Sequence, residues 1–350
     1  MMRTYLDHNA TTPLRAEARE AMIAAMEVYG NPSSVHSEGR KAKAILERAR
    51  GDIASAFGAD GADVIFTSSA TESAALALSG RNLHAAGIEH DAVNAWTLND
   101  LLVDEQGSVA VHDPSASCVQ LANSETGVVQ NLPDGVAVSD MTQAFGKLPL
   151  AFNWTGAHMA LISAHKLGGP KGIGALVVKR GTEVPAQLLG GGQEMGRRAG
   201  TENVIGAAGF AAAAKVAVQE LADGVWDRVA ELRDLLEDRL SADAPDAIIV
   251  GKGAKRLPNT TAVAVPGWKG ETQVMQMDLA GYAISAGSAC SSGKVRASKV
   301  LTAMGFDEMT AASAIRVSLG PHTSEQDVMG FADKWLAQMH KHRALARQKD

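Results

Sequence analysis

The sequence predicts an α/β fold with a doubly wound, mostly parallel sheet. Helical and extended patterns alternate through most of the first 210 residues, which is the arrangement expected of strands connected through helices. The chain of 350 residues can bury a large core, and its length suggests two domains or three. In a sheet of this kind ligands bind at the carboxyl ends of the strands, so we expect a site there.

Three helix patterns occupy the N-terminal part of the chain. The first covers residues 13–29, with proline at its start and apolar residues at helical spacing. The second covers residues 37–57 and ends at Gly58, and the third runs from Glu72 to residue 78. Short apolar runs predict strands at residues 64–67, 109–111, 118–122, 136–139, 159–163 and 175–178.

The C-terminal part predicts a second, smaller α+β domain. Residues 206–240 indicate one long helix, or two that meet near Gly224. Strands are expected at residues 261–265 and 283–285, and an amphipathic helix with a serine cap at 324–347. The predicted division is a large domain of residues 15–225 and a small domain of residues 1–14 and 226–350.

Composition excludes several classes of protein. The chain is 46% hydrophobic and 21% charged, with a net charge of −6, so it offers no basic field for nucleic acid or anionic lipid. Its first residues lack the apolar core of a signal peptide, and no uninterrupted apolar stretch is long enough to span a membrane. The two cysteines, Cys118 and Cys290, cannot form a disulfide framework. We therefore expect a cytoplasmic protein.

A lysine and an aspartate follow two of the predicted strands. Lys166 comes after the run that ends at Ser163, and Asp140 follows the run at 136–139. Most lysines are solvated surface charges, but an amine at the end of a buried strand can form a Schiff base with a cofactor aldehyde. Pyridoxal phosphate needs such an amine and an acidic partner for its ring nitrogen, so this pair predicts that cofactor.

Two further segments are suited to an anion. Residues 67–73 carry small hydroxyl side chains where a strand ends and a helix begins, which favours phosphate, although an ordinary helix cap has the same pattern. Ser163 and His165 could add phosphate contacts. Residues 190–201 combine glycines with two arginines and a threonine, which suits an anion, a neighbouring subunit or a mobile surface loop.

Three other residues each have a functional and an ordinary interpretation. Cys290 lies among small polar residues near Lys294, where it is either a partly ionised nucleophile or an incidental surface thiol. Cys118, on a predicted strand, fits core packing. Arg316 is a cation inside an apolar run, which suits a substrate carboxylate or an internal salt bridge. His90 could be an aromatic lid or a general acid or base, although an isolated histidine is more often neither.

A series of motifs in fixed order spans nearly the whole chain. They lie at residues 5–13, 30–34, 69–73, 125–128, 140–143, 165–166, 198–201, 288–290 and 315–320. Together they resemble the cysteine desulfurases of the NifS/IscS type, in the class V aminotransferase superfamily of fold-type I pyridoxal phosphate enzymes. The resemblance implies a seven-stranded-type, mostly parallel sheet flanked by helices, and a smaller α+β domain that carries the catalytic cysteine loop.

The resemblance also implies a role for each site residue. Lys166 holds pyridoxal phosphate as a Schiff base, Asp140 pairs with the pyridine nitrogen, and Gln143 hydrogen-bonds the ring hydroxyl. His90 stacks on the ring and is a candidate for proton transfer at the substrate thiol. The implied phosphate contacts are Ala70, Thr71, Ser163, His165 and, from a second subunit, Thr201. The implied substrate contacts are Arg316, Ser124 and Asn123.

The activity implied by the resemblance is conversion of L-cysteine to L-alanine, with the sulfur transferred to a persulfide on Cys290. Its implied use is iron–sulfur cluster assembly or thio-modification. The implied partners are L-cysteine, a second copy of the chain in a homodimer, and a sulfur-acceptor or scaffold protein, with no nucleic acid and no membrane. Metal binding is also expected from the resemblance, although no residue of the chain is assigned as a metal ligand.

Two features depart from the family pattern. The segments between Thr71 and Asp140 are short, and residues 131–135 replace what is normally a helix, so we expect a thinner covering of the sheet. Ser124 stands where the family usually has asparagine, and a serine has a shorter reach than an amide. This difference bears on substrate affinity and selectivity.

Two alternatives to a cysteine desulfurase stay open at this point. One is a selenocysteine lyase or another pyridoxal phosphate-dependent relative, in which Cys290 would be dispensable. The other is a degenerate paralogue that binds the cofactor or a partner without turnover. The presence together of Lys166, Asp140, His90, Cys290 and Arg316 argues against the degenerate paralogue.

Overall fold

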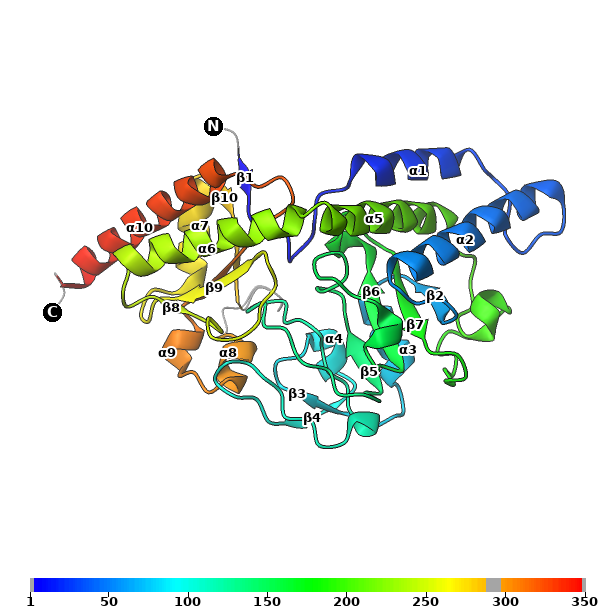
Figure 1. Cartoon of the computed structure of the whole chain (residues 1–350), viewed down its shortest axis with the longest axis horizontal. Coiled ribbons are helices and arrows are strands. Elements are labelled where there is room, and N and C mark those ends of the chain that lie inside the picture. Colours follow the sequence, from blue (N-terminus) through cyan, green and yellow to red (C-terminus); the bar gives the residue numbers. More distant parts are fainter. Residues whose placement is uncertain (1–2, 288–296, 348–350) are drawn as a thin grey trace.

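A computed structural model describes residues 3–287 and 297–347 of the chain (Figure 1). The helices are α1 (Ala16–Met26), α2 (Ser37–Ala56), α3 (Ala70–Leu78), α4 (Asp91–Asn94), α5 (Val204–Ala222), α6 (Val225–Asp243), α7 (Gly270–Leu279), α8 (Lys299–Ala303), α9 (Glu308–Ala311) and α10 (Glu325–Arg347). The strands are β1 (Thr4–Tyr5), β2 (Asp63–Thr67), β3 (His84–Ala86), β4 (Leu98–Leu101), β5 (Val138–Asp140), β6 (Met159–Ser163), β7 (Gly174–Val178), β8 (Ile248–Ile249), β9 (Thr260–Ala264), β10 (Tyr282–Ala283), β11 (Ser285–Ala286) and β12 (Ala314–Ser318).

The N-terminal half is built on a sheet with the strand order β2-β7-β6-β5. β5 and β6 are parallel, whereas β7 is antiparallel to both of its neighbours. Parallel pairs of Cys118 with Val138 and of His84 with Ser117 extend this sheet through an irregular segment to the β3–β4 pair. The four strands, the irregular segment and the β3–β4 pair give the expected seven-stranded, mostly parallel arrangement, with β7 as the antiparallel member.

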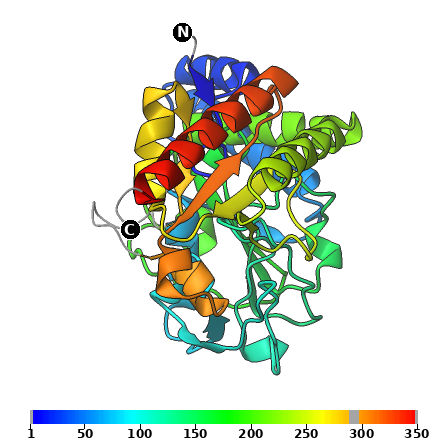
Figure 2. The same ribbon diagram turned by 90° about the vertical axis from the view of Figure 1, so that its left-hand side faces the viewer.

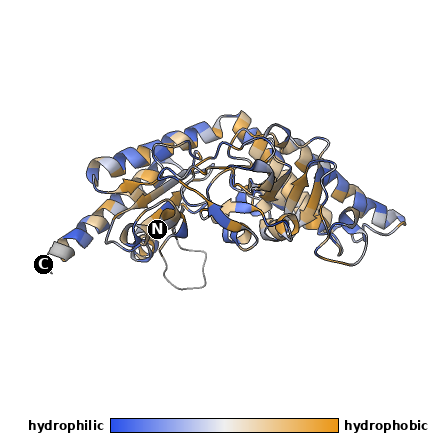
Figure 3. Cartoon of the chain, turned by 90° about the horizontal axis from the view of Figure 1, so that it is seen from below, coloured by the Kyte–Doolittle hydropathy of each residue, from blue (hydrophilic) through white to orange (hydrophobic). Residues whose placement is uncertain are grey.

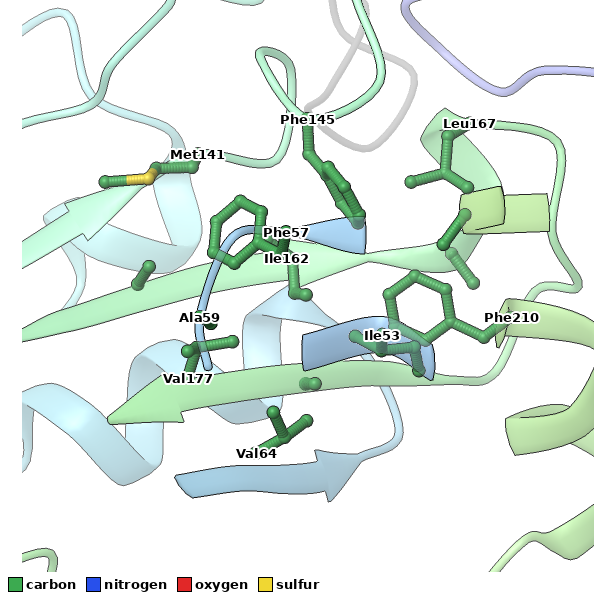
Figure 4. Packing of buried hydrophobic residues seen from close by; sticks show 14 of the residues in the cluster. Ile53, Phe57, Ala59, Val64, Met141, Phe145, Ile162, Leu167, Val177 and Phe210 are labelled. Carbon is green, nitrogen blue, oxygen red and sulfur yellow. The ribbon is translucent and has the colours of Figure 1, made fainter. Parts of the chain in front are cut away.

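Helices cover both faces of this sheet, and alternate residues of a strand point to opposite faces. On β6, Ile162 packs in the cluster formed with α1, α2 and α5, whereas Leu161 packs in the cluster formed with α3. Figure 4 shows Phe57, Phe145 and Phe210 gathered near Ile162 in the first cluster. The strands are apolar along their length because both faces are buried.

α5 is the central helix of the layer that it forms with α1 and α2 (Figure 1). By length and composition alone it could cross a membrane. In the structure α5 packs against α1 and α2, and its own residues Phe210, Ala213 and Ala214 are buried in the core. Burial of this kind is typical of a core helix.

The C-terminal half contains an antiparallel sheet with the strand order β11-β12-β9-β8, and β1 pairs beside it with β10. α10 lies beside α6 in both views (Figure 1, Figure 2), and Trp335 on α10 meets Trp268 with 5.4 Å between ring centroids. Polar and apolar residues alternate along α10 (Figure 3), as expected of an amphipathic helix. Ser324 caps it by accepting from the Asp327 amide at 3.2 Å.

Most of the predicted elements are confirmed, and the differences have local causes. Gly224 adopts a positive φ of 72° and separates α5 from α6, so the alternative with two helices is correct. The strand predicted at 109–111 is wrong as a strand, because only Val109 pairs, with Val103. The strand predicted at 283–285 is divided between β10 and β11.

The shortened segments have the structure that their lengths predict. Residues 131–135 form no helix. Between His90 and Glu125 the chain contains the one-turn helix α4, the strand β4 and a short 3-10 turn at Pro114–Ala116. β4 is the last strand on its side of the sheet, and Leu98 on it is half exposed, at 50%. The covering of this edge is therefore thin.

Candidate active site

A pocket lies where the parallel strands end, which is the usual position of a ligand site in a sheet of this kind. Its walls come from segments that follow β2, β3, β5 and β6, together with the irregular segment after Cys118. The predicted site residues that line it are Ala70, Thr71, His90, Ser124, Asp140, Gln143, Ser163, His165 and Lys166. The strand-end position expected from the sequence is thus confirmed.

Lys166 lies in a 3-10 turn directly after β6. Its Nζ donates to the backbone oxygens of Asn9, at 2.6 Å, and Ala10, at 3.0 Å. The neighbouring His165 ring nitrogen Nδ1 lies 3.2 Å from Thr11 Oγ1. Burial, and secondly the charge of Lys166, lowers the pKa of His165 to about 4, so this ring is neutral near pH 7.

Asp140 ends β5, the strand parallel to and paired with β6, so it lies at the same edge of the sheet as Lys166. Its carboxylate accepts from the Thr142 amide at 2.9 Å. Gln143 follows in the same turn and donates from Nε2 to the Asn9 backbone oxygen at 3.0 Å. The pairing of an acid and an amine expected from the sequence is present in one pocket.

The first turn of α3 faces the same pocket. Ser69 caps the helix by accepting from the Glu72 amide at 3.3 Å, which leaves the turn with Ala70 and Thr71 at the pocket wall. Gly174, at the start of β7, lies directly against this turn: an added Cβ would be 2.8 Å from the Ser69 carbonyl carbon and 3.0 Å from the Ala70 nitrogen. Because β7 lies so close to the N-terminus of α3, position 174 requires glycine. The backbone amides at this helix N-terminus are suited to binding an anion.

His90 follows β3 and caps the short helix α4, with Nδ1 accepting from the Ala92 amide at 3.1 Å. In the neutral ring this bond places the proton on Nε2. Behind it, the buried carboxyl of Glu89 accepts from the Gln120 amide at 2.7 Å. Burial raises the pKa of Glu89 well above its usual range, and the Asp140 charge adds to that effect. Sequence reasoning did not single out Glu89, because an acid beside a histidine carries no pattern of its own.

Arg316 lies on β12, beside the pocket rather than among its lining residues. It donates to the Asp7 carboxylate at 2.8 Å and to the Ser124 backbone oxygen at 3.0 Å. The internal salt bridge considered from the sequence is therefore present. Ser124 does line the pocket, so the guanidinium lies directly behind the pocket wall.

Asn123 is not brought to the pocket. It is 1% exposed, its Oδ1 accepts from the amides of Glu125 and Thr126 at 2.9 and 2.8 Å, and its Nδ2 donates to the Ile88 oxygen at 3.0 Å. These bonds shape the turn that presents Ser124. Asn123 therefore holds the backbone, and we do not retain it as a substrate contact.

The glycine- and arginine-rich loop is tied down by ion pairs. Arg197 pairs with Asp63 and Arg198 with Glu72, each at 2.7 Å. Both cations that suggested an anion site from the sequence thus have acidic partners within the chain. Thr201 is exposed and does not line the pocket of its own chain.

Cys290 lies outside the described residues. The described chain stops at Gly287, whose amide donates to the Ala314 oxygen at 3.2 Å, and resumes at Ala297. A side chain at Gly287 would collide with the buried carboxyl of Glu125. Burial raises the pKa of Glu125 to about 7. Cys118 is fully buried, which confirms its interpretation as a core residue.

Comparison with known proteins identifies the family. The family model described as Aminotransferase class-V matches residues 4–96 and 100–331. The chain is 34% identical to cysteine desulfurase IscS of Dictyoglomus turgidum, covering 93% of this chain and 91% of that protein, and 36% identical to a cysteine desulfurase of Klebsiella pneumoniae, covering 94% and 90%. A NifS-like protein from Rickettsia africae has a solved structure with a TM-score of 0.86 at 32% identity, covering 95% of this chain and 98% of that one. The chain therefore belongs to the class-V aminotransferase family.

Proposed function

We propose that this protein is a pyridoxal phosphate-dependent cysteine desulfurase that converts L-cysteine to L-alanine and receives the sulfur on Cys290. The observation that carries the proposal is the single pocket that joins Lys166, Asp140 and the first turn of α3. Its support is the similarity to curated cysteine desulfurases at 34% to 38% identity. That similarity does not favour a selenocysteine lyase or a degenerate paralogue.

The residues of the pocket fit the cofactor. Lys166 would provide the amine for the aldehyde, Asp140 the acid for the ring nitrogen, and Gln143 and His90 would contact the ring. The α3 turn, held close to β7 by Gly174, would take the phosphate together with Ser163 and the neutral ring of His165. When bound, pyridoxal phosphate withdraws electrons from the α-carbon of an amino acid and so weakens the bonds around it.

The chain's own residues would then bind the substrate and move protons and sulfur. Arg316 holds the L-cysteine carboxylate, the Lys166 amine takes the α-carbon proton, and His90 Nε2 exchanges a proton with the substrate sulfur. The Cys290 thiolate attacks that sulfur, so that the carbon–sulfur bond breaks and a sulfur–sulfur bond forms. The electron pair of the broken bond stays with the β-carbon. Of the three protons that move, one returns to the α-carbon and one goes to the β-carbon of alanine, and the third remains with the persulfide.

A second copy of the chain belongs to the proposal. Apolar side chains at one end of the molecule are largely exposed, among them Ile23, Met26, Tyr29, Leu189 and Met195, at 54%, 55%, 87%, 85% and 60%. Met195 shares a surface depression with Pro32, so its loop lies next to the segment that follows α1. Exposed apolar patches of this kind favour association. In a homodimer Thr201 would contact the phosphate bound by the partner.

The proposal has three further parts: the division into domains, the location and the sulfur acceptor. The two cores on either side of the α5–α6 junction support the division into a large domain of residues 15–225 and a small domain of residues 1–14 and 226–350. The attacking thiol of Cys290 must not be oxidised to a disulfide, which supports a cytoplasmic location. The persulfide also needs an acceptor, a sulfur-carrying or scaffold protein in iron–sulfur cluster assembly or thio-modification.

The experiment that tests the proposal measures L-alanine after the purified protein is loaded with pyridoxal phosphate and given L-cysteine. We expect alanine from the wild type, no cofactor absorption band in Lys166→Ala, and a normal band without alanine in Cys290→Ser. Alanine formed at the wild-type rate by Cys290→Ser would favour a lyase. A wild type that shows the cofactor band but makes no alanine would indicate a degenerate paralogue.

A further inference from the structure

Lys147 is a buried lysine that neither the motifs nor the pocket explain. It is 3% exposed and lies four residues after Gln143. Its Nζ donates to Gln143 Oε1 at 2.7 Å and to Asn9 Oδ1 at 3.0 Å. Among the residues that the structure describes, no carboxylate lies within ion-pairing distance of it. Burying an amine without an anion is costly, so the position calls for an explanation.

The two bonds of Lys147 fix the direction of the Gln143 amide and contribute to that of Asn9. Asn9 Oδ1 also accepts from Asn259 Nδ2 at 3.1 Å. An ammonium group only donates, and a neutral amine still has two hydrogens to donate, so in either state the acceptors are oxygens. Gln143 must therefore turn Oε1 to Lys147 and Nε2 to the Asn9 backbone oxygen. Asn9 must turn Oδ1 to Lys147, which leaves its Nδ2 to donate to the Ser124 oxygen at 3.2 Å.

The same network carries the amine of Lys166. The Asn9 backbone oxygen accepts from Gln143 Nε2 at 3.0 Å and from Lys166 Nζ at 2.6 Å. Asn9 and Gln143 are 1% and 5% exposed, so the bond between them is buried. Both donors to this carbonyl are thus linked to Lys147, Gln143 directly and Lys166 through Asn9.

We propose that Lys147 is a positioning residue of the active site, which orients the Gln143 amide and the Asn9 carbonyl for the cofactor and for Lys166. This inference rests on the proposed function, because it assumes that pyridoxal phosphate binds in the pocket. Lys147 itself lies outside the pocket lining and acts through Gln143 and Asn9.

Electrostatics favours the same arrangement. Burial lowers the pKa of Lys147 well below its usual range, and the charges of Lys166 and Arg316 lower it further. Lys166 and Lys147 bind the two oxygens of one residue, so a charge on Lys166 disfavours a charge on Lys147. A neutral Lys147 amine still donates to both of its oxygen partners, so the arrangement persists.

A double-mutant cycle tests this role. The variants are Lys147→Met, Gln143→Ala and the double variant, with Lys171→Met as the matched control. Lys171 is an exposed lysine whose charge also acts on His165, but no hydrogen bond joins it to Asn9 or Gln143 among the described residues. The measurements are the dissociation constant for pyridoxal phosphate and the absorption spectrum of the bound cofactor.

Each active-site single variant should weaken cofactor binding about tenfold and change the ratio of the absorption bands. Because Lys147 acts through Gln143, the double variant should be no more than about threefold weaker than Gln143→Ala. Lys171→Met should stay within about twofold of the wild type. Lys147→Gln, whose shorter side chain reaches only one of the two acceptors, should be intermediate.

Wild-type binding and a wild-type spectrum in Lys147→Met would overturn the inference, and so would effects that multiply in the double variant. If Lys147→Met does not fold, the cycle is repeated with Lys147→Gln, and a wild-type dissociation constant there has the same meaning. A wild type that forms no cofactor band at all would refute the proposed function itself. Failure of the inference and failure of the function are therefore distinguished by the wild type.

Discussion

The Arg316 guanidinium donates to the Asp7 carboxylate at 2.8 Å, immediately behind the pocket wall. The two side chains are only 11% and 16% exposed. Asp7 also accepts from Ser285 Oγ at 2.8 Å, on the strand that leads toward the segment of Cys290. The chain thus supplies its own anion to the arginine proposed to bind the substrate carboxylate, and the substrate must compete with that anion.

Replacing Asp7 with asparagine should remove this competition. We expect Asp7→Asn to lower KM for L-cysteine about threefold to tenfold, because the guanidinium loses a partly buried ionic partner. The measurement is a Michaelis–Menten series with alanine as the product. A higher KM in Asp7→Asn would instead mean that Asp7 is needed to orient Arg316 for the substrate.

Ser124→Asn should strengthen substrate binding. The backbone oxygen of Ser124 already holds Arg316 and Asn9, and an asparagine would keep those bonds while adding an amide at the pocket wall. One added hydrogen bond to a charged carboxylate corresponds to roughly a tenfold lower KM. Kinetics with L-cysteine check this. An unchanged KM would show that the family's asparagine is not needed in this pocket.

Glu125 should make stability depend on pH. Burial raises its folded-state pKa from 4.5 to about 7, against the opposing effects of Ser298 and Arg316. Folding therefore favours the protonated form of Glu125. Its contribution to the free energy of unfolding is complete below about pH 4.5 and is lost as the pH rises through 7. Between these limits the wild type should lose about 3 kcal/mol more unfolding free energy than Glu125→Gln.

Denaturant unfolding of both proteins at several pH values measures this difference. The low pKa values of His8 and His165, both about 4, affect the two proteins alike and cancel in the comparison. Parallel stability profiles for the wild type and Glu125→Gln would contradict the assignment.

A buried ion pair away from the pocket should affect the stability of the fold but not the binding of the cofactor. Arg256 and Glu237 are 6% and 4% exposed and meet through two bonds of 2.7 Å, and Thr261 Oγ1 donates to the same carboxylate at 2.8 Å. Glu237→Gln leaves the guanidinium without its anion, which should cost about 3 kcal/mol of unfolding free energy.

The matched control for that variant is Asp234→Asn, which breaks the more exposed pair with Arg233 and should change stability by less than about 1 kcal/mol. Both are measured by denaturant unfolding, with the cofactor absorption band as a check on the pocket. Equal losses in the two variants would show that burial does not determine the value of the Arg256–Glu237 pair.

Elements with strong local patterns could be predicted from the sequence. β6 has the predicted bounds, residues 159–163, because a strand buried on both faces is apolar throughout. The pocket was also predictable, because Asp140 ends β5, Lys166 follows β6, and neighbouring parallel strands end at one edge. The irregular segment at 118–122 pairs as predicted but does not form a regular strand.

The residues that organise the site could not be predicted in the same way. Asn9 bonds to Gln143, Lys147, Thr260 and Asn259, which are all more than a hundred positions away in the chain. Asp7 meets Arg316 across a separation of 309 residues. Periodicity and spacing describe neighbours in sequence, so contacts of this range, and the burial of the Lys147 amine, emerge only from the folded chain.

The measurement that tests the central claim most directly is the location of sulfur after one turnover. The cofactor-loaded protein receives one equivalent of L-cysteine, and its peptides are analysed by mass spectrometry before and after reduction. We predict one added sulfur atom on the Cys290 peptide, lost on reduction and matched by one equivalent of alanine, with the buried Cys118 unmodified. Sulfur released only as free sulfide, with Cys290 unmodified, would contradict the claim.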